Sequence, residues 1–322
     1  MHKIYIRVAA LVVSLATVSP THAFQLAVSQ YGRVTATLPW AVAMEKGYFD
    51  DAKIKIDQVI AGAGGGTTLR NVLASDLPYG EVATSAAIAA RRAGLDVVIV
   101  NTSSSHIGEI SLVADPKSDI HGVADLTGKK AGYTAPKSTS DVLLHLALKE
   151  AKLTDKVEAV ATGGFGPGIT ALLTGAIQAA PLIDPPLTLE PDKFRVILKF
   201  ADVIPRMTWL VGITTHEFAT KNPELLRKLI AVRRRAVDYI YANRDDAMQI
   251  YAKVWQQDPK QVATYFPKYF GYEGEWTRGE FEAAGLAKMS EGLELVGDVD
   301  KPVDWKAMID QEFLPQDVQN PL

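Results

Sequence analysis

Short apolar runs alternate with helix-like patterns along most of this chain, and this alternation limits the possible folds more than any other feature. Gln25–Ser29, Ile54–Ile60 and Ile110–Ala114 are predicted to be strands. Between such runs, segments such as Leu38–Lys46 and Ser140–Ala151 have the apolar spacing of helices. Strands that alternate with helices predict an α/β protein.

A second α/β unit is expected to begin near Leu126–Tyr133, where a turn leads into a strand. The strand predicted at Trp209–Thr214 should return to the first unit. From Asn222 onward the chain has mainly helical patterns. We expect a helix to start there, with the Asn222 amide as its cap and Pro223 in its first turn. The chain is therefore predicted to form two units.

The first 23 residues have the pattern of an export signal. Lys3 and Arg7 precede the apolar run Val8–Ala16, and Thr21–Ala23 fits the small-x-small rule for cleavage. The apolar run is roughly half of the ~20 residues that a membrane-spanning helix needs. We therefore expect a signal peptide at 1–23 that is removed, and a mature chain in the periplasm.

Charge and composition exclude several classes of function. The formal net charge is −3, and removing Lys3 and Arg7 would make it more negative, so the surface does not favour nucleic acid or anionic lipid. The sequence contains no cysteine, which excludes disulfides, thiolate metal sites and cysteine nucleophiles. We expect no nucleic-acid partner and no cofactor.

Hydroxyl and glycine residues follow several predicted strands. These segments are Gly62–Thr68, Thr84-Ser85, Asn101–Ser105, Ser138–Ser140 and Gly163–Gly166. In open α/β sheets, ligands bind beyond the carboxyl ends of strands. Each segment alone could equally be a helix cap or a tight turn. Together they predict a nearly uncharged site that recognises a small polar or anionic solute through hydrogen bonds.

Patterns typical of enzymes are weak in this sequence. No histidine has metal-ligand spacing, and there is no Gly-x-Ser-x-Gly motif. His145 is expected to be a satisfied helix residue. Arg233–Arg235 lies within a predicted helix, so its side chains should form a solvated or ion-paired face. We therefore expect a binding protein rather than an enzyme.

Five ordered motifs resemble the solute-binding proteins of ABC importers, in the branch that binds sulfonates, taurine, nitrate and thiamin-pyrimidine precursors. The similarity runs from Gln25 to about Ala252. The motifs are Trp40–Phe49, Gly62–Thr68 with Leu73–Ser75, Leu126–Gly132, Leu172–Ala180 and Phe218–Leu225. No single motif is specific for this family, but the order and spacing of the five motifs together are specific for it.

This resemblance implies a type II periplasmic binding protein fold, with two α/β lobes, two crossover strands and a ligand cleft between the lobes. Lobe 1 would comprise residues 24–112 and 213–322, and lobe 2 residues 113–212. The residues that the resemblance places in the cleft are Gln30, Tyr31, Gly64, Gly65, Thr84 and Ser85 from lobe 1, and Ser138, Thr139, Ser140, Phe165 and Asp184 from lobe 2.

Asp184 departs from the family pattern, since sulfonate binders often have an aromatic residue just before the proline that follows this strand. An acid in the cleft would repel an anion unless Arg33, Arg70 or Arg206 offset it. Tyr31, Trp40, Tyr133, Phe165 and Trp209 are candidates for apolar cover of the ligand, although each could instead belong to the core.

The resemblance implies a monomeric periplasmic receptor that captures a small organic solute (a sulfonate, carboxylate or heterocycle) by hinge closure. It would deliver the solute to an inner-membrane permease with its ATPase. Two alternatives remain open: a ligand-sensing receptor for a membrane signalling protein, and an enzyme on the same two-lobed fold.

Overall fold

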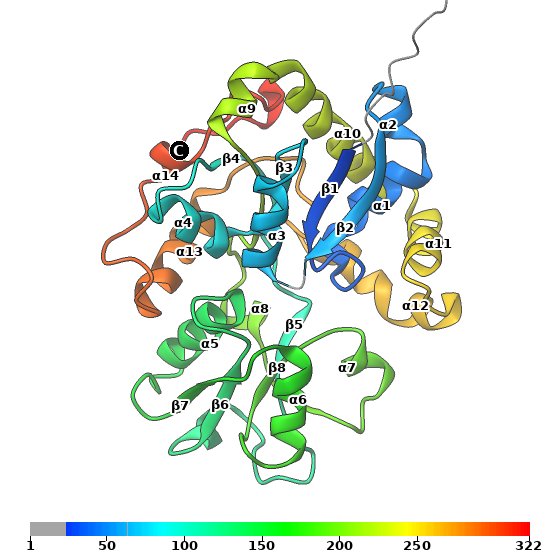
Figure 1. Ribbon diagram of the computed structural model, residues 1–322. Helices are drawn as coiled ribbons and strands as arrows, with labels where there is room; N and C mark the ends of the chain where they lie inside the picture. The colour runs from blue at the N-terminus through cyan, green and yellow to red at the C-terminus, as the bar shows by residue number, and fades with distance from the viewer. Residues whose placement is uncertain (1–23, 63) are drawn as a thin grey trace, which may run out of the picture.

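The structure is a computed structural model that describes residues 24–62 and 64–322. The predicted signal peptide, residues 1–23, lies outside these described residues. Figure 1 shows two α/β lobes, one above the other, joined by a narrow region of connecting chain. The expected α/β class and two-lobed architecture are confirmed.

The sheet of the first lobe has five strands in the order β2-β1-β3-β10-β4. Strand β1 pairs in parallel with β2 and β3, whereas β10 is antiparallel to both β3 and β4. The returning strand is therefore inserted in the middle of this sheet. The strand bounds are β1 Phe24–Ser29, β2 Ile56–Gly62, β3 Tyr79–Ala83, β4 Val98–Ser104 and β10 Leu210–Thr214.

The second lobe contains an antiparallel sheet in the order β8-β5-β9 and a parallel pair, β6 and β7. A parallel bridge between Ala131 and Ala179 connects the pair to the chain just before β8. The bounds are β5 Ile110–Ala114, β6 Lys130–Tyr133, β7 Glu158–Ala161, β8 Ala180–Ile183 and β9 Arg195–Lys199. The predicted strand at 110–114 is confirmed to the residue.

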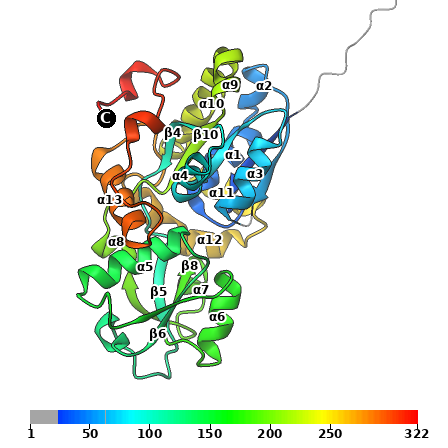
Figure 2. The same ribbon diagram turned by 60° about the vertical axis from the view of Figure 1, so that its left-hand side comes forward.

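Helices cover the sheets of both lobes, and Figure 2 shows that α13 and α12 of the first lobe approach the second lobe. The first lobe carries α1 Leu38–Glu45, α2 Tyr48–Asp51, α3 Gly65–Leu73, α4 Thr84–Arg92, α9 His216–Lys221, α10 Pro223–Ala242, α11 Arg244–Val254, α12 Pro259–Tyr265, α13 Ala283–Leu295 and α14 Trp305–Met308. The second carries α5 Thr139–Glu150, α6 Phe165–Leu173, α7 Pro186–Leu189 and α8 Phe200–Val203. Short 3₁₀ helices are η1 Thr35–Thr37, η2 Val123–Leu126, η3 Phe266–Gly271 and η4 Gln316–Val318.

Local sequence signals explain where several helices begin and end. Gly47 has a positive φ of 67° directly after α1, a conformation that costs glycine little. The Ser138 side chain accepts a hydrogen bond from the backbone of Asp141 and so caps α5. Pro223 begins α10 as expected, but the Asn222 side chain makes no capping hydrogen bond, so that part of the prediction is wrong.

The run Asn101–Ser105 does not form a loop at the ligand edge, because β4 continues through Ser104 and these residues are buried. The Tyr79 hydroxyl donates to Asn101 Oδ1 at 3.1 Å, and the Ser103 hydroxyl donates to Glu81 Oε1 at 2.7 Å. Partners inside the core therefore satisfy Asn101 and Ser103, whereas the buried hydroxyls of Thr102 and Ser105 have no hydrogen-bond partner among the described residues.

The chain passes between the lobes twice, in the segment between β4 and β5 and in the segment between β9 and β10. The lobes also pack against each other where α13 meets α5 and where α12 meets α7. Among the described residues, no helix combines the length and apolar character required to cross a bilayer.

Candidate functional site

Two of the predicted site residues, Gln30 and Tyr31, form the turn after β1. Gln30 has a positive φ of 56°, and its N–H donates to the Gly62 carbonyl at the end of β2. The Tyr31 ring packs on Trp255 with 5.6 Å between centroids, and burial raises the pKa of its hydroxyl to about 12. The structure therefore places this pair at the carboxyl end of two parallel strands.

The glycine-rich turn leads into α3, and its two predicted site residues differ. A Cβ on Gly65 would lie 2.7 Å from the Ala86 Cβ, so glycine is needed there for packing against α4. A Cβ on Gly64 would meet nothing within 4 Å among the described residues. Packing against α4 therefore explains why residue 65 is a glycine, with no need for a ligand. Gly64, by contrast, lies beside open space.

Thr84 and Ser85 begin α4 and are both buried. The Thr84 hydroxyl donates to the Trp209 carbonyl at 3.0 Å, and so does the Thr84 N–H. These bonds attach the start of α4 to the segment that returns to β10. Thr84 therefore has a structural partner close to the crossover.

In the second lobe, the predicted hydroxyls of Ser138 and Ser140 form one network with Thr134. Ser140 Oγ accepts from the Thr134 N–H at 2.9 Å, and it lies 2.8 Å from Thr134 Oγ1 and 3.1 Å from Ser138 Oγ. Thr139 is half-buried beside them, and Phe165 is half-buried at the start of α6. The structure brings the serines together as predicted, but they already bond one another.

Asp184 follows β8, is buried, and points toward the first lobe. Its carboxylate forms an ion pair with Lys268 and accepts from the Tyr269 hydroxyl at 3.4 Å. The sequence suggested Arg33, Arg70 or Arg206 as the partner, and this is wrong. Arg206 instead pairs with the carboxylates of Glu273 and Glu282.

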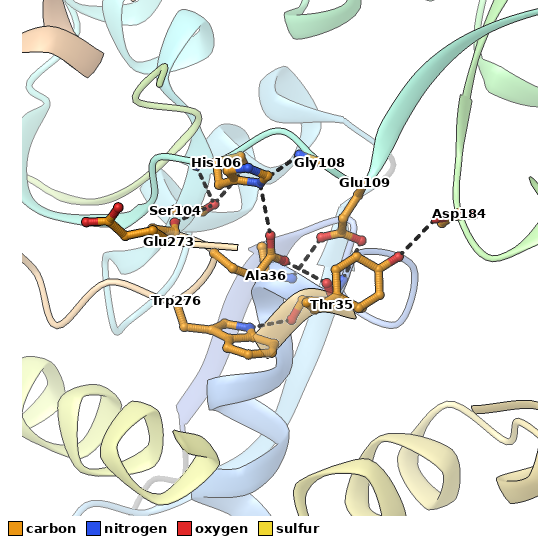
Figure 3. Close-up of polar contacts among 12 residues, drawn as sticks. Thr35, Ala36, Ser104, His106, Gly108, Glu109, Asp184, Glu273 and Trp276 are labelled. Atoms are coloured by element: carbon orange, nitrogen blue, oxygen red, sulfur yellow. Dashed lines mark hydrogen bonds and ion pairs between the residues drawn. The ribbon is translucent and has the colours of Figure 1, made fainter. Parts of the chain in front are cut away.

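Two buried glutamates beside Asp184 were not found by the sequence reasoning. Glu109 lies just before β5, and its carboxylate accepts from the N–H groups of Thr35 and Ala36 at 2.7 and 3.0 Å (Figure 3). The Thr35 hydroxyl donates to Glu275 Oε1 at 2.6 Å. Glu109, Asp184 and Glu275 are called the acidic cluster below, and the two glutamates are charged groups that the prediction of a nearly uncharged site did not include.

The carboxyls of Glu109 and Glu275 shift each other's protonation. Burial raises the pKa of both carboxyls, and the neighbouring Glu109 charge raises that of Glu275 well above its usual range. Two like charges this close in a dry environment do not both ionise readily. Because Glu109 holds two backbone N–H groups, we assign the negative charge to Glu109 and the proton to Glu275.

His106 lies beside Glu275 without forming an ion pair. Its Nδ1 accepts from the Gly108 N–H at 2.9 Å and is 3.9 Å from Glu275 Oε2, too far for a hydrogen bond. Burial, with the charge of Arg206, lowers the pKa of His106 to about 4. The imidazole is therefore neutral near pH 7.

The aromatic cover comes mostly from residues other than those predicted. Trp40 is buried in the core against Phe49, and Trp209 is buried beside β10. Rings from α11, η3 and the following loop instead pack next to the acidic cluster. This aromatic wall consists of Tyr251, Phe266, Tyr269, Tyr272 and Trp276.

Hydrogen bonds attach the aromatic wall to the acidic cluster. The Trp276 Nε1–H donates at 2.8 Å to the carbonyl of Thr35, the residue that also donates to Glu109 and Glu275 (Figure 3). Tyr272 stacks on His106 with 4.5 Å between centroids. The sequence offered one weak signal for this region, an acid placed among aromatic residues at 272–276.

The Arg233–Arg235 run corrects a further prediction. Arg234 and Arg235 form surface ion pairs with Asp317 and Asp51, as expected. Arg233, by contrast, is 2% exposed and pairs with buried Glu81. Within the described residues no group of three or more histidines and acids is arranged to hold a metal ion.

Comparisons with known proteins agree with this architecture. The NMT1/THI5-like family matches residues 35–247, more than half of the chain. A protein of Brucella abortus (strain 2308), named as a binding protein, is 26% identical over 231 residues, which is 70% of this chain and 69% of the relative.

Two solved structures share the fold at low sequence identity. The periplasmic aliphatic sulphonate binding protein SsuA from Escherichia coli has a TM-score of 0.72 and 20% identity, covering 90% of this chain and 92% of that one. The desulfurization enzyme DSZB has a TM-score of 0.61 and 16% identity, covering 90% and 97%. Both binding proteins and an enzyme therefore use this fold. From the match over residues 35–247, the chain belongs to the NMT1/THI5-like family, and it has the periplasmic binding protein fold.

Proposed function

We propose that this protein is the substrate-binding component of an ABC importer, which captures a small organic solute and delivers it to an inner-membrane permease with its ATPase. The observation that carries the proposal is the convergence of buried polar groups from both lobes. Asp184, after β8, meets Lys268 and Tyr269 of η3 beside the crossover segment that carries Glu109. Family membership and the binding-protein relative support the same function.

The mechanism we propose is closure of lobe 2, which contains β5 to β9, onto lobe 1, which contains β1 to β4 and the chain from β10 onward. Open and closed forms exchange, and the solute stabilises the closed form because only there does it contact both lobes. Ion pairs between the lobes, Lys268 with Asp184 and Lys149 with Glu291, would form in that state.

The residues proposed to line the cleft are those expected from the family resemblance, together with the acidic cluster. They are Gln30, Tyr31, Gly64, Gly65, Thr84, Ser85, Ser138, Thr139, Ser140, Phe165 and Asp184, with Glu109 and Glu275 added. We propose that the protein works as a monomer in the periplasm after removal of residues 1–23.

Closure can be measured directly, because the sequence has no cysteine and introduced thiols can be labelled selectively. Asp50→Cys and Asp155→Cys place dyes on exposed positions of the two lobes. Sulfonates, carboxylates, amines and pyrimidines are then added one at a time to the labelled protein. Energy transfer between the two dyes should rise with the compound that is the solute. A control pair within lobe 1, Asp50→Cys with Lys228→Cys, should not change. If no solute changes the signal of the interlobe pair, the proposed function is wrong.

An enzyme remains the second candidate, because the desulfurization enzyme DSZB shares the fold. This chain cannot use a thiol nucleophile, since it has no cysteine. Mass spectrometry of a bound solute after prolonged incubation distinguishes the two functions. A carrier returns the solute unchanged, whereas an enzyme returns a product.

A further inference from the structure

The two lobes touch on two sides, and the two contacts differ in chemistry. On one side, α13 of the first lobe packs against α5 of the second (Figure 2). On the other side, α7 of the second lobe meets α12 and η3 of the first. A motion that opens a cleft between the lobes must separate at least one of these contacts, so their difference indicates which one separates.

The contact between α5 and α13 is apolar and closely packed. Val142 and Leu146 of α5 are buried, and they belong to one core that continues from the first lobe into this helix. Gly292 of α13 lies at the crossing, where a Cβ would be 2.3 Å from Val142 Cγ1 and 3.1 Å from Leu146 Cδ1. Glycine therefore lets the two helices approach more closely than a larger residue would. Val142, Leu146 and Gly292 are called the apolar contact below.

The contact on the other side is polar and less buried. All four residues of α7 remain at least partly exposed. Lys268 of η3 pairs with Asp184 and donates to the Thr188 hydroxyl at 3.5 Å, and the Tyr269 hydroxyl donates to Asp184 at 3.4 Å. These four residues are called the polar contact below. The apolar side chains behind α7 form a core of their own, made of Val113, Leu172, Ile177, Ala180, Leu182 and Phe194.

The two contacts respond differently to separation. Pulling α5 away from α13 would expose apolar surface to water, which is unfavourable roughly in proportion to the area exposed. The groups of the polar contact can instead exchange one another for water when their side opens, at a small net cost. Opening should therefore separate the polar contact and keep the apolar contact.

Ion pairs near the two ends of α5 are compatible with such a motion. Lys137, just before α5, pairs with Asp298 at 3.0 Å, and Lys149, in its last turn, pairs with Glu291 at 2.7 Å. Both lysines are about half exposed, so water can replace their partners. The helices can thus turn about Gly292 while these outer ion pairs form or break.

We propose, building on the importer function above, that the crossing of α5 and α13 at Gly292 is a fixed pivot. It stays packed in the open and closed forms, and the lobes separate on the side of the polar contact. The solute therefore enters and leaves between α7 and η3. Small rotations of packed helices are an established way for domains to close.

The test links each contact in turn, which is possible because the sequence has no cysteine. Val142→Cys with Gly292→Cys links the pivot, since a Cβ at 292 lies beside Val142 Cγ1 and the two Cβ atoms fall within the ~3.5–4.5 Å that a disulfide spans. Thr188→Cys with Lys268→Cys, joined by a short bis-maleimide, links the polar contact. Small-angle X-ray scattering without solute then measures the radius of gyration of each protein.

The pivot variant should have the same radius of gyration when oxidised and when reduced. Its disulfide should also form completely without solute, because the contact is kept in the open form. The polar-contact variant should have a smaller radius of gyration when linked than when its two thiols are capped separately with N-ethylmaleimide. The reduced and capped forms are the matched controls, and circular dichroism checks that each variant folds.

A second pair tests the pivot if Gly292→Cys prevents folding. Glu150→Cys with Lys288→Cys lies at partly exposed positions of the same two helices, where Lys288 Nζ is 4.0 Å from Glu150 Oε1, and a bis-maleimide can join it. A smaller radius of gyration after linking the pivot, a pivot disulfide that forms only with solute, or an unchanged radius after linking the polar contact overturns the pivot. These results leave the importer function untouched, because the solute screen with the dye pair decides it separately.

Discussion

Two buried acidic regions of this protein differ in how their charge is balanced. In the first lobe, Glu81 contacts Arg233, which also donates to the carbonyls of Thr277 and Ser103. Between the lobes, the acidic cluster has three carboxyls but one ion pair, between Asp184 and Lys268. The first region is balanced by an ion pair, whereas in the second Glu109 relies on backbone N–H groups and Glu275 on a proton.

This difference shows two ways in which a protein offsets the desolvation of a buried carboxyl. A buried charge is tolerated when a partner and hydrogen bonds offset its desolvation. The Glu81–Arg233 pair meets that condition and joins β3, β4 and the loop after η3. Glu275 avoids this cost in another way, because its carboxyl carries the proton and so buries no unpaired charge. The predictions below test whether the Glu81–Arg233 pair serves stability and whether the Ser140 hydroxyl of the second lobe serves binding.

The largest effect is expected from Arg233→Met. Removing the guanidinium leaves Glu81 as an unpaired buried charge, which costs about 3–5 kcal/mol of folding free energy. Urea unfolding followed by circular dichroism measures this loss.

Arg235→Met is the matched control for that variant, because Arg235 is 54% exposed and its pair with Asp51 lies on the surface. A surface ion pair contributes about 0–1 kcal/mol. Equal losses in the two variants would contradict the structural role assigned to Arg233.

The next effect concerns acid stability and His106. Folding lowers the pKa of His106 to about 4, so between about pH 6.5 and 4 the unfolded chain binds a proton that the folded chain does not. This contribution to stability is complete above pH 6.5 and is lost as the pH falls toward 4, by up to about 3 kcal/mol. We expect His106→Gln to flatten the loss, measured as melting temperature against pH. An unchanged profile in the variant would show that His106 is not the group responsible.

The smallest effect is expected from Ser140→Ala. Its hydroxyl accepts from the Thr134 N–H, so the substitution should cost about 1–2 kcal/mol of stability. Binding of the solute should weaken by roughly 1–3 kcal/mol if Ser140 also lines the cleft. Thr139→Ala is the neighbouring control for stability, and calorimetry measures the affinity. An affinity equal to that of the wild type would remove Ser140 from the site and sharpen the contrast with the acidic cluster.

Much of the fold could be predicted from the sequence, because strands and helices leave local patterns. Strand Ile110–Ala114 was placed to the residue, and α10 begins at Pro223 within one residue of the prediction. The error at Asn101–Ser104 has a physical cause: polar residues in a strand look like a loop when their partners are distant in sequence. Tyr79 and Glu81 supply those partners from β3.

The site was predicted only in part. The serines of α5 and the turn at Gln30 lie at strand or helix ends, so their positions follow from local sequence. Glu109 and Glu275 are separated by most of the chain, and no local pattern connects them. Lys268 was missed as the partner of Asp184 for the same reason.

By itself, the sequence determined the class of architecture, the order of the two units and the absence of thiol chemistry, because each depends on composition or on residues near one another. Only the tertiary structure decided the electrostatics between the lobes. The charge on a buried carboxyl depends on what surrounds it in space, and the surroundings of Glu275 come from Thr35, His106 and Glu109, which the fold alone brings together.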